Sequence, residues 1–468
     1  MSPDPIDTVI EGGTLVGPDG TTETALGVDD GRIVAVGDPA RLPPARERVD
    51  ATGQLVLPGV VDPHVHAGDD PFTEDTVGTA SRAAALGGVT TFLNFAWEGW
   101  DGPNTVYDPA TTLVEGIDRQ RRGADEAVVD YGCHGTLASG TDAALDDLAA
   151  AVDRGVTSFK LFTAYDVGVS TGYVDAAFRR IAALGAVGVV HTEDGAVCER
   201  LTAALRSAGR GDPTAYPESR PAYAEAMAAD DVARLAVETG VKYYGVHTSC
   251  AAAAERLAAY REDGSRIRAE TCTNYLLYDE SAYEDHGALA MAAPPLRTPD
   301  DVAALYDHLR DGVLSVVSTD HVAFSRARKE AENWWDSPFG TNNLQRHLVV
   351  LHDAAVANGD LSRSALVRYL STNPARTFGL HGKGTLAPGT DADLVVFDPD
   401  ATQTIRAADN ASNADFTVHE GREVEGRVEQ TFVRGERVAV DGEVVAPAGH
   451  GEFVEREVPT WEPAGARP

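Results

Sequence analysis

The chain has 468 residues, and its 73 acidic side chains outnumber its 39 lysine and arginine side chains, which gives a net charge of −34. Such a charge repels nucleic acid and anionic membranes, so both are excluded as partners. Apolar residues make up 43% of the chain, and its 46 glycines and 25 prolines are scattered instead of forming tracts. These proportions indicate a globular protein and not a disordered or collagen-like chain.

Only four of the basic residues are lysines, so arginine carries nearly all the positive charge. Dense carboxylate surfaces are tolerated where salt screens their repulsion, and we interpret the charge as an adaptation to high salt. The alternative is an acidic protein that self-repulsion keeps soluble. The four cysteines are too far apart for a zinc knuckle or a disulfide framework, and most are expected to be small buried hydrophobic residues.

The start of the chain, MSPDPIDTVIEGG, lacks the basic and apolar regions of a signal peptide. No stretch approaches the ~20 apolar residues that span a bilayer. We therefore expect a cytoplasmic protein that has no contact with a membrane.

Both ends of the chain have the pattern of short strands. Residues 6–56 alternate apolar and polar positions around turn signals, and the same pattern returns from residue 385. We expect antiparallel strands in both segments and one small β-sandwich domain built from residues 1–56 and 385–450. The final segment, 451–468, is rich in proline and glycine and is expected to be an extended or mobile tail.

Between these ends, residues 57–384 alternate apolar strand-like runs with amphipathic segments rich in Ala, Leu and Arg. This order is typical of a parallel sheet with crossover helices. Eight predicted strands favour a (β/α)8 TIM-type barrel over an open doubly wound sheet, and no phosphate-binding or dinucleotide-binding motif follows any of them. The strands are predicted at 60–66, 89–95, 128–136, 158–163, 187–191, 243–247, 267–271 and 314–318.

The strongest local motif pairs two histidines near the end of the first predicted barrel strand. Alternation along a strand points His64 and His66 to the same side. Two imidazoles there suit a divalent metal, and a nearby carboxylate can orient them. Taken alone, the pair fits two ordinary polar residues at a strand exit equally well.

Three later strands end in the same way. His191, His247 and Asp320 each end or follow an apolar strand, where barrel active sites are assembled. A single histidine at such a position is more often a satisfied core residue. Four strands that converge on one end with polar residues are better explained by a shared site.

Lys160 lies inside an apolar strand, flanked on both sides by apolar residues. Because an unpaired buried ammonium is costly, such a lysine is ion-paired, deprotonated or chemically altered. Reaction with CO2 gives a carbamate, whose two oxygens can bridge two metals. Without further context, an ion pair is the simpler interpretation.

Longer motifs surround these residues throughout the chain. They are PGVVDPHVH (58–66), GGVTT (87–91), SFKLFTAY (158–165), VHTEDG (190–195), VHTS (246–249), ETCTNYL (270–276), PPLR (294–297), TDH (319–321), STNPARTFGL (371–380) and KGTLAPGTDADLV (383–395). In these motifs the chain resembles the dihydropyrimidinase/hydantoinase group of cyclic amidohydrolases, over nearly its whole length.

The resemblance implies a two-metal site, with zinc as the default metal, and the hydrolysis of a small cyclic amide, a dihydropyrimidine or a 5-substituted hydantoin, to an N-carbamoyl acid. It also implies a homotetramer. The complete ligand set argues against the scaffolding relatives of the group, which have lost ligands. By this resemblance the first metal is held by His64, His66 and Asp320, the second by His191 and His247, and both are bridged by carboxylated Lys160.

Two further roles follow from the resemblance. Asp320 would carry the proton from the attacking water to the leaving ring nitrogen. Tyr165 would donate a hydrogen bond to the oxyanion that develops on the carbonyl. The bland alternative for Tyr165 is an aromatic residue at the barrel rim.

The chain departs from the group at several positions that bear on which ring it binds. Ala293 replaces a serine whose backbone contacts the ring, and Phe339 replaces an asparagine that meets the ring amide in the group. Trp97 and Trp100 occupy an unusual loop, where they could line a pocket for an apolar substituent or pack on a neighbouring subunit.

Allantoinase and dihydroorotase activities are the near alternatives. Dihydroorotases place an arginine shortly after the paired histidines to hold a carboxylate, whereas an acidic loop, Ala67-Gly-Asp-Asp, follows here. A single-metal deaminase is the more distant alternative, because such enzymes need no bridging lysine.

Overall fold

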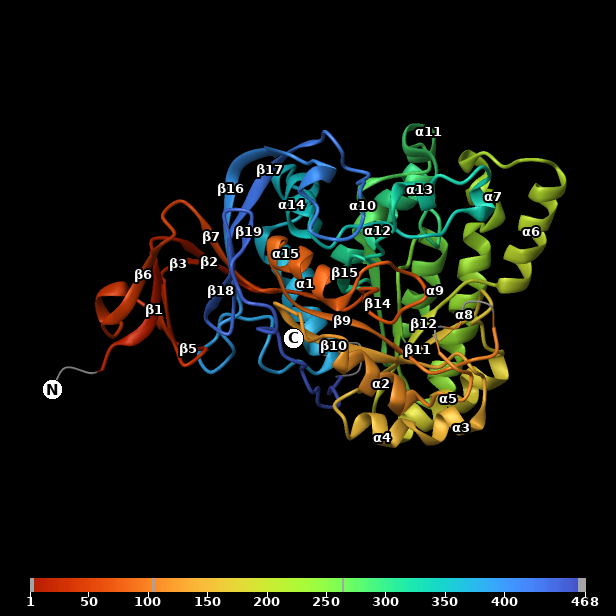
Figure 1. Cartoon of the computed structure of the whole chain (residues 1–468), viewed down its shortest axis with the longest axis horizontal. Helices are drawn as coiled ribbons and strands as arrows, with labels where there is room; N and C mark the ends of the chain where they lie inside the picture. The colour runs from red at the N-terminus through yellow and green to blue at the C-terminus, as the bar shows by residue number, and fades with distance from the viewer. Residues whose placement is uncertain (1–3, 103–104, 106, 263–264, 462–468) are drawn as a thin grey trace.

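A parallel sheet of eight strands forms the centre of the computed structural model, which describes residues 4–102, 105, 107–262 and 265–461 (Figure 1). The strands follow one another in chain order across the sheet, and each pairs in parallel with the next. They are β8 (Val60–Asp62), β9 (Val89–Trp97), β10 (Asp130–Thr136), β11 (Ser158–Phe162), β12 (Val187–His191), β13 (Lys242–Gly245), β14 (Ile267–Cys272) and β15 (Val316–Ser318).

The sheet closes on itself through the segments that follow its first and last strands. Val65 forms a parallel bridge with His321. The His66 amide donates to the His321 carbonyl at 2.9 Å, and the His321 amide donates to the His64 carbonyl at 3.3 Å. The predicted TIM-type barrel is therefore confirmed, and its closure lies at the carboxyl ends of the strands.

The first strand is shorter than predicted. Regular pairing of β8 ends at Asp62, so His64 and His66 lie in the irregular segment after it. These two histidines therefore do not alternate along a strand as predicted. They still face the same site, because the bridge to His321 holds the segment in an extended path.

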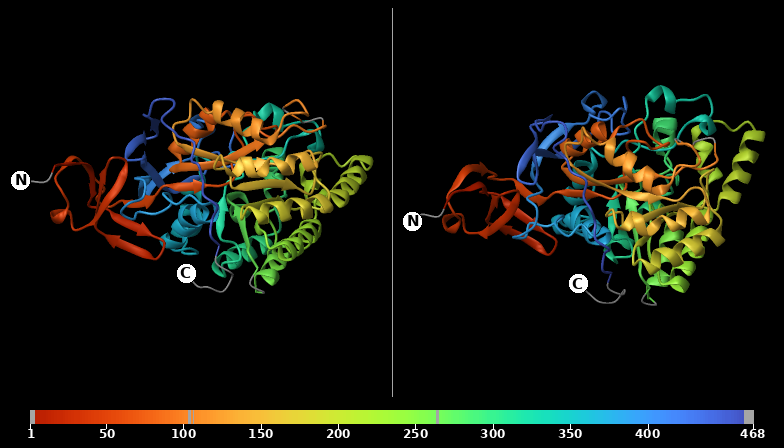
Figure 2. Two further views of the ribbon diagram at one scale, coloured as in Figure 1. Left: turned by 90° about the horizontal axis from the view of Figure 1, so that it is seen from below. Right: turned by 60° about the horizontal axis from the view of Figure 1, so that its bottom comes forward.

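Helices cover the outside of the barrel between successive strands (Figure 2). Threonines begin several of them: the Thr112 hydroxyl accepts from the Glu115 amide while the Glu115 carboxylate accepts from the Thr112 amide, which satisfies two free donors. The longer helices are α1 (Val77–Leu86), α2 (Leu113–Arg122), α5 (Thr171–Ala183), α6 (Gly195–Ser207), α8 (Ala222–Thr239), α9 (Ala251–Glu262) and α12 (Pro299–Arg310). The shorter ones are α3 (Asp142–Asp146), α4 (Leu148–Val152), α7 (Tyr216–Ser219), α10 (Thr273–Leu277), α11 (Ala282–His286), α13 (Arg326–Lys329), α14 (His347–Leu351), α15 (Arg363–Val367) and α16 (Asn373–Phe378).

Within the described residues, no helix is long and apolar enough to cross a membrane. All four cysteines are buried and unpaired, as predicted. They therefore contribute as small apolar side chains.

Two further sheets lie beside the barrel and combine both ends of the chain (Figure 1). One buried cluster joins them, with Ile10 and Val28 from the first sheet and Val56, Val396 and Phe432 from the second. The first sheet has the order β5 (Arg32–Gly37), β4 (Ala25–Asp29), β1 (Ile6–Glu11), β6 (Ala45–Asp50). The second has the order β19 (Glu443–Val444), β18 (Glu436–Val440), β17 (Glu423–Val433), β16 (Leu394–Thr404), β7 (Leu55–Pro58), β2 (Thr14–Gly17), β3 (Gly20–Glu23).

These sheets are mixed and not purely antiparallel as predicted. β1 pairs in parallel with β6, and β2 pairs in parallel with β7. The alternation of apolar and polar residues is the same in both directions, so the sequence pattern could not distinguish them. The domain boundaries at residues 56, 385 and 450 stay predictions.

The described part of the tail is extended but closely packed against the barrel. The Arg456 guanidinium is buried and donates to the Ser158 hydroxyl at 2.8 Å. Trp461 is 4% exposed, and its indole donates to the Thr377 carbonyl at 3.0 Å. The alternative of a mobile tail is therefore wrong for residues 451–461, because Arg456 and Trp461 are buried against barrel residues.

We expect Trp461→Ala to lower the free energy of unfolding by about 3–5 kcal/mol, because it removes a large side chain from a packed cluster. Denaturant titration would measure the change. Val445→Ala is the control, since Val445 is 52% exposed in the same C-terminal region and should change stability by no more than about 0.5 kcal/mol. Equal stability of the two variants would contradict a structural role for the tail.

Candidate active site

The six predicted metal ligands gather at one mouth of the barrel, where the carboxyl ends of the strands meet. They line a cavity of about 270 Å³ together with Tyr165, Ala293 and Phe339. The ligands are His64 and His66 after β8, Lys160 in β11, His191 at the end of β12, His247 after β13 and Asp320 after β15.

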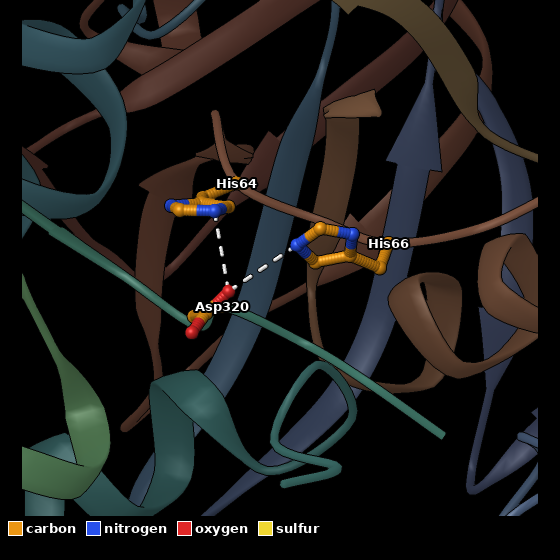
Figure 3. A group of neighbouring side chains, drawn as sticks. All are labelled: His64, His66 and Asp320. Atoms are coloured by element: carbon orange, nitrogen blue, oxygen red, sulfur yellow. Dashed lines mark ion pairs between the residues drawn. The ribbon is translucent and has the colours of Figure 1, made fainter. Parts of the chain in front are cut away.

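Three of these residues form a cluster that fits a metal ion. Nε2 of His64 lies 3.2 Å from Oδ1 of Asp320, and Nε2 of His66 lies 3.5 Å from the same oxygen (Figure 3). One ligand atom from each residue lies within 4.8 Å of the other two. Imidazole and carboxylate donors accept Zn, Mn, Co or Fe, so the set fits a divalent cation.

Two buried carboxylates orient the histidines of this cluster. Oε1 of Glu270 lies 2.5 Å from Nδ1 of His64, and Oδ2 of Asp70 lies 2.8 Å from Nδ1 of His66. Each contact occupies Nδ1 and leaves Nε2 facing Asp320. Burial opposes a charged imidazole at His66, but Asp70 and Asp320 outweigh it and raise the pKa of His66 to about 9. The local field is therefore negative and favours a bound cation.

Sequence reasoning assigned no role to Asp70 or Glu270. Asp70 lies in the acidic loop Ala67-Gly-Asp-Asp, and its place four residues after His66 is the signal that could have found it. Glu270 is separated from His64 by 206 positions. The sequence feature that could have found Glu270 is its position inside an apolar strand. A glutamate is rarely fully buried without a partner, so a partner could have been expected.

His191 and His247 form a second pair of donors. Nδ1 of His191 lies 2.8 Å from Nε2 of His247, and Nε2 of His191 lies 2.9 Å from Oε2 of Glu193. Burial lowers the pKa of both imidazoles, so both are neutral and have lone pairs for a metal. Glu193 is itself held by the buried guanidinium of Arg220. The two clusters adjoin, since the rings of His64 and His247 lie 5.4 Å apart.

Lys160 is 1% exposed and lines the same cavity as the two clusters, with Nζ over the rings of Phe95 and Phe162 at 5.2 and 4.8 Å. Among the described residues its ammonium has no hydrogen bond and no ion pair, so the simpler interpretation of an ion pair is wrong. Burial lowers the pKa of Lys160 to about 8, although Asp320 and Glu270 oppose the shift. The site therefore contains an amine that the protein does not neutralise with a salt bridge.

Three residues of the site have left-handed backbone conformations without being glycine. Their φ angles are +68° at Tyr165, +39° at His247 and +47° at Asp320. Such conformations cost energy and persist only where neighbouring contacts fix them. Three residues that line the cavity therefore have a strained backbone.

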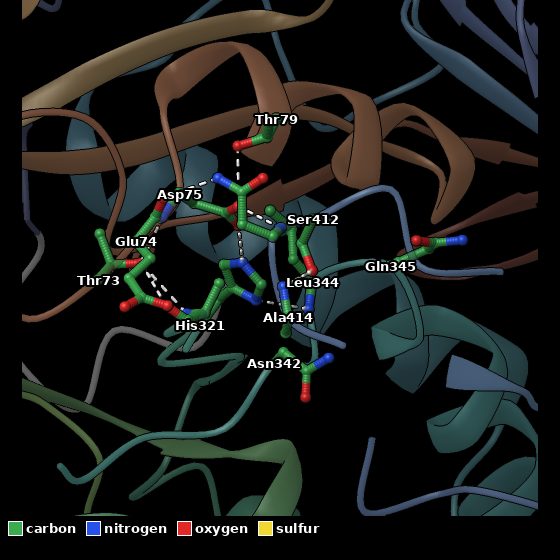
Figure 4. A network of polar contacts seen from close by, with 12 residues as sticks. Thr73, Glu74, Asp75, Thr79, His321, Asn342, Leu344, Gln345, Ser412 and Ala414 are labelled. Atoms are coloured by element: carbon green, nitrogen blue, oxygen red, sulfur yellow. Dashed lines mark hydrogen bonds and ion pairs between the residues drawn. The ribbon is translucent and has the colours of Figure 1, made fainter. Parts of the chain in front are cut away.

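The residue after Asp320 is anchored by a buried polar network (Figure 4). Nε2 of His321 lies 2.9 Å from Oδ2 of Asp75. The other oxygen of Asp75 accepts from the Thr79 hydroxyl at 2.8 Å and from the Asn413 amide at 2.7 Å. This network holds the strained Asp320 backbone and joins the barrel mouth to the C-terminal segment.

Tyr165 lies next to the second pair of histidines. Its ring centroid is 5.0 Å from that of His191, and the Arg220 guanidinium lies 4.6 Å over its face. Burial raises the pKa of Tyr165 well above its usual range, so the phenol stays protonated and can donate.

Apolar side chains form the outer walls of the cavity. Phe72, Val322 and Phe324 line it together with the Ala293 and Phe339 segments. The ring of Phe339 stacks on Tyr216 with centroids 5.0 Å apart. Arg328 also lines the cavity, but its guanidinium pairs with Glu74 at 2.9 Å. The walls therefore suit an apolar ligand better than an anion.

The sequence predicts that the two tryptophans either line a substrate pocket or pack on a neighbouring subunit, and both predictions are wrong. Trp97 and Trp100 are 0% and 2% exposed, and neither lines the cavity. Trp97 stacks on Phe162 with centroids 5.7 Å apart and contacts Phe72 edge-on at 5.5 Å. They lie inside the subunit, where they support cavity-lining rings from behind.

Known proteins resemble this chain over nearly its whole length. Residues 55–438 match the model of the amidohydrolase family. A D-hydantoinase of Streptomyces coelicolor is 36% identical over 96% of this chain and 98% of its own, and a D-phenylhydantoinase of Escherichia coli is 33% identical over 96% and 98%. The crystal structure of a dihydropyrimidinase from Brevibacillus agri is 33% identical and superimposes with a TM-score of 0.92, covering 97% of this chain and 99% of the other.

We expect Asp70→Asn to weaken metal binding by about 10- to 100-fold, because the ring of His66 loses the carboxylate that orients it. Competition with a chelator would measure the affinity. Asp69→Asn is the matched control, since Asp69 is exposed and accepts only from the Tyr107 hydroxyl, at 3.1 Å, among the described side chains. If both variants bind metal like the parent, Asp70 does not orient His66.

Proposed function

Because the chain belongs to the amidohydrolase family, in its hydantoinase and dihydropyrimidinase group, we propose that it hydrolyses the ring of a small cyclic amide or imide to an N-carbamoyl acid. Dihydropyrimidines and 5-substituted hydantoins are the proposed substrates. The observation that carries the proposal is the convergence of five imidazole and carboxylate donors and one unpaired lysine on a single cavity.

The donor set supports two cations per chain. His64, His66 and Asp320 would hold the first, while His191 and His247 need a further ligand to hold the second. A carbamate on Lys160, formed with CO2, would supply that ligand and bridge the pair, and zinc is the proposed metal. When bound, two such cations supply an activated water and polarise the ring carbonyl.

Asp320 would move the proton. Its carboxylate faces the cavity between the two histidines after β8. The imidazoles hold the pKa of Asp320 well below its usual range against the effect of burial, so the carboxylate is ionised. It would accept a proton from the attacking water as a weak base and, once protonated, act as a strong acid toward the ring nitrogen. It then delivers that proton to the ring nitrogen as the carbon–nitrogen bond breaks.

Tyr165 would stabilise the negative charge that develops on the carbonyl oxygen. Its phenol is protonated, and its weak contact with Glu193, at 3.4 Å, can be exchanged for a stronger one. A preorganised donor of this kind is commonly worth about 3 kcal/mol in the transition state. Arg220, packed on the ring face, would keep the phenol aimed at the cavity.

The cavity walls favour a ring with an apolar substituent. Ala293 offers backbone groups to the ring, and Phe339 offers an apolar face. Arg328 lines the cavity but pairs with Glu74 at 2.9 Å, so its guanidinium is a poorer anchor for a dihydroorotate carboxylate than a free arginine would be.

We expect the metal-loaded protein to open 5-substituted hydantoins and dihydrouracil, and Lys160→Ala to lose metal and to lower turnover by about three orders of magnitude or more. A substrate panel that adds allantoin and dihydroorotate, with metal analysis of each protein, would test this. Lys242→Ala is the control, because that lysine is also buried but donates to the Gly185 carbonyl away from the site.

The outcomes separate the alternatives. Turnover of allantoin alone would replace the proposed substrate class. One metal per chain would favour deaminase chemistry. An active, metal-loaded Lys160→Ala protein would rule out the bridging role.

We further propose a homotetramer in the cytoplasm of a salt-adapted organism. All four lysines, Lys160, Lys242, Lys329 and Lys383, are at most 8% exposed. The cations of the described surface are therefore arginines and histidines, among an excess of carboxylates. A surface of this kind gains stability when salt screens its repulsion.

We expect the melting temperature to rise as KCl is increased from low to molar concentration, because screening weakens repulsion within a net charge of −34. Thermal unfolding in a KCl series would measure the trend, and size-exclusion chromatography in the same series would report the oligomer. Full stability at low salt would contradict the adaptation.

A further inference from the structure

A second buried lysine, which the proposed chemistry does not use, lies behind the wall of the cavity. Lys329 is 0% exposed and ends the short helix α13. Its ammonium donates to the carbonyls of Met291 at 2.8 Å, Pro338 at 3.0 Å and Gly340 at 2.8 Å. Three acceptors match the three N–H donors of an ammonium, so its hydrogen-bonding capacity is filled.

This arrangement differs from that of a lysine held by acidic side chains. Among the described residues, no carboxylate lies within ion-pair distance of Lys329, whereas Lys383 contacts three carboxylates at 2.6 to 3.0 Å. Burying a charge is costly unless it is solvated by other groups. Here three backbone carbonyls take the place of water around the ammonium, and these carbonyls belong to two loops.

The two loops that Lys329 joins form one wall of the cavity. Met291 lies two residues before Ala293, and Pro338 and Gly340 flank Phe339, so each loop carries a residue that lines the cavity. The loops meet at one further hydrogen bond, from the Gly340 amide to the Met291 carbonyl at 2.8 Å. The Met291 carbonyl thus accepts from both the ammonium and the opposite loop.

We propose that Lys329 is a positioning residue for ring recognition, which clasps the Ala293 and Phe339 loops together at the spacing that the cyclic substrate requires. The proposal rests on the function proposed above. Substrate binding draws on this wall. The histidines and Lys160 of the site belong to other strands, and Asp320, which begins the segment that leads to Phe339, is held separately by the contacts of His321. Loss of the clasp should therefore raise KM and leave metal content and kcat nearly unchanged.

The test compares Lys329→Met with Lys242→Met in the full-length, metal-loaded protein. Methionine keeps the length and apolar stem of the side chain and removes the donors. Lys242, the first residue of β13, is the matched control, because it is buried and its ammonium donates to one carbonyl among the described residues, that of Gly185, at 2.6 Å. We expect KM for a 5-substituted hydantoin to rise about tenfold or more in Lys329→Met, with kcat within about threefold, and neither to change in Lys242→Met.

Hydrogen exchange gives a readout that does not depend on catalysis. The Gly340 amide should exchange faster in Lys329→Met, together with amides of 289–293 and 337–341, and not in Lys242→Met. If the methionine variant does not fold, Lys329→Arg is judged by the same measurements, with a smaller rise in KM expected because some donors remain.

The outcomes distinguish this inference from the proposed function. Unchanged KM and unchanged exchange in a variant of an active parent would overturn the role of Lys329 alone. An equal loss of kcat and metal would also overturn it, since the lysine would then support the whole barrel mouth. If the parent opens no ring, the proposed function fails, and exchange of the Gly340 amide still decides whether the clasp exists.

Discussion

The bridge between Val65 and His321 is the contact on which the site depends. It joins the segment after the first barrel strand to the segment after the last, and so brings residues separated by most of the barrel into contact. His64 and His66 flank one side of the bridge, and Asp320 precedes the other. Without closure, these ligands would lie at opposite edges of an open sheet, and the cluster with ligand atoms within 4.8 Å could not form.

Closure alone does not aim the side chains, and buried charges carry out that second task. Glu270 and Asp70 fix the histidines after β8, and Glu193 with Arg220 fixes His191. Each of these groups would be costly to bury alone. Each group has a buried partner in the site, and the contact with that partner offsets the cost of removing the group from water. The same contact orients the side chain.

The four lysines of the chain also depend on their buried surroundings. The described surface has no exposed lysine, and the four lysines of the chain are distributed among interior positions where an ammonium or amine has a specific environment. Lys383 ties the barrel to the sheets through three carboxylates and Lys329 binds three carbonyls, whereas Lys160 has neither kind of partner among the residues that the structure describes. The difference between these environments is what separates a structural cation from a reactive amine.

The sequence by itself determined the eight strands and helices of the barrel and the residue types at the strand ends. Apolar runs and helical periodicity are local properties, and each of His191, His247 and Asp320 is marked by its own strand. The long motifs added the family and, by resemblance to it, the prediction of which residues would hold each metal. These parts needed no knowledge of how distant segments pack.

Only the tertiary structure decided the rest. The partners of the ligands, such as Glu270, lie far away in the chain, and strand direction in the mixed sheets leaves no trace in alternation. Trp97 and Trp100 read as candidate pocket residues until packing placed them behind Phe162 and Phe72. The sequence predicts an extended or mobile tail, and the burial of Arg456 and Trp461 decides against mobility. In each case the deciding contact joins segments remote in sequence, and its energy depends on burial that a local pattern does not encode.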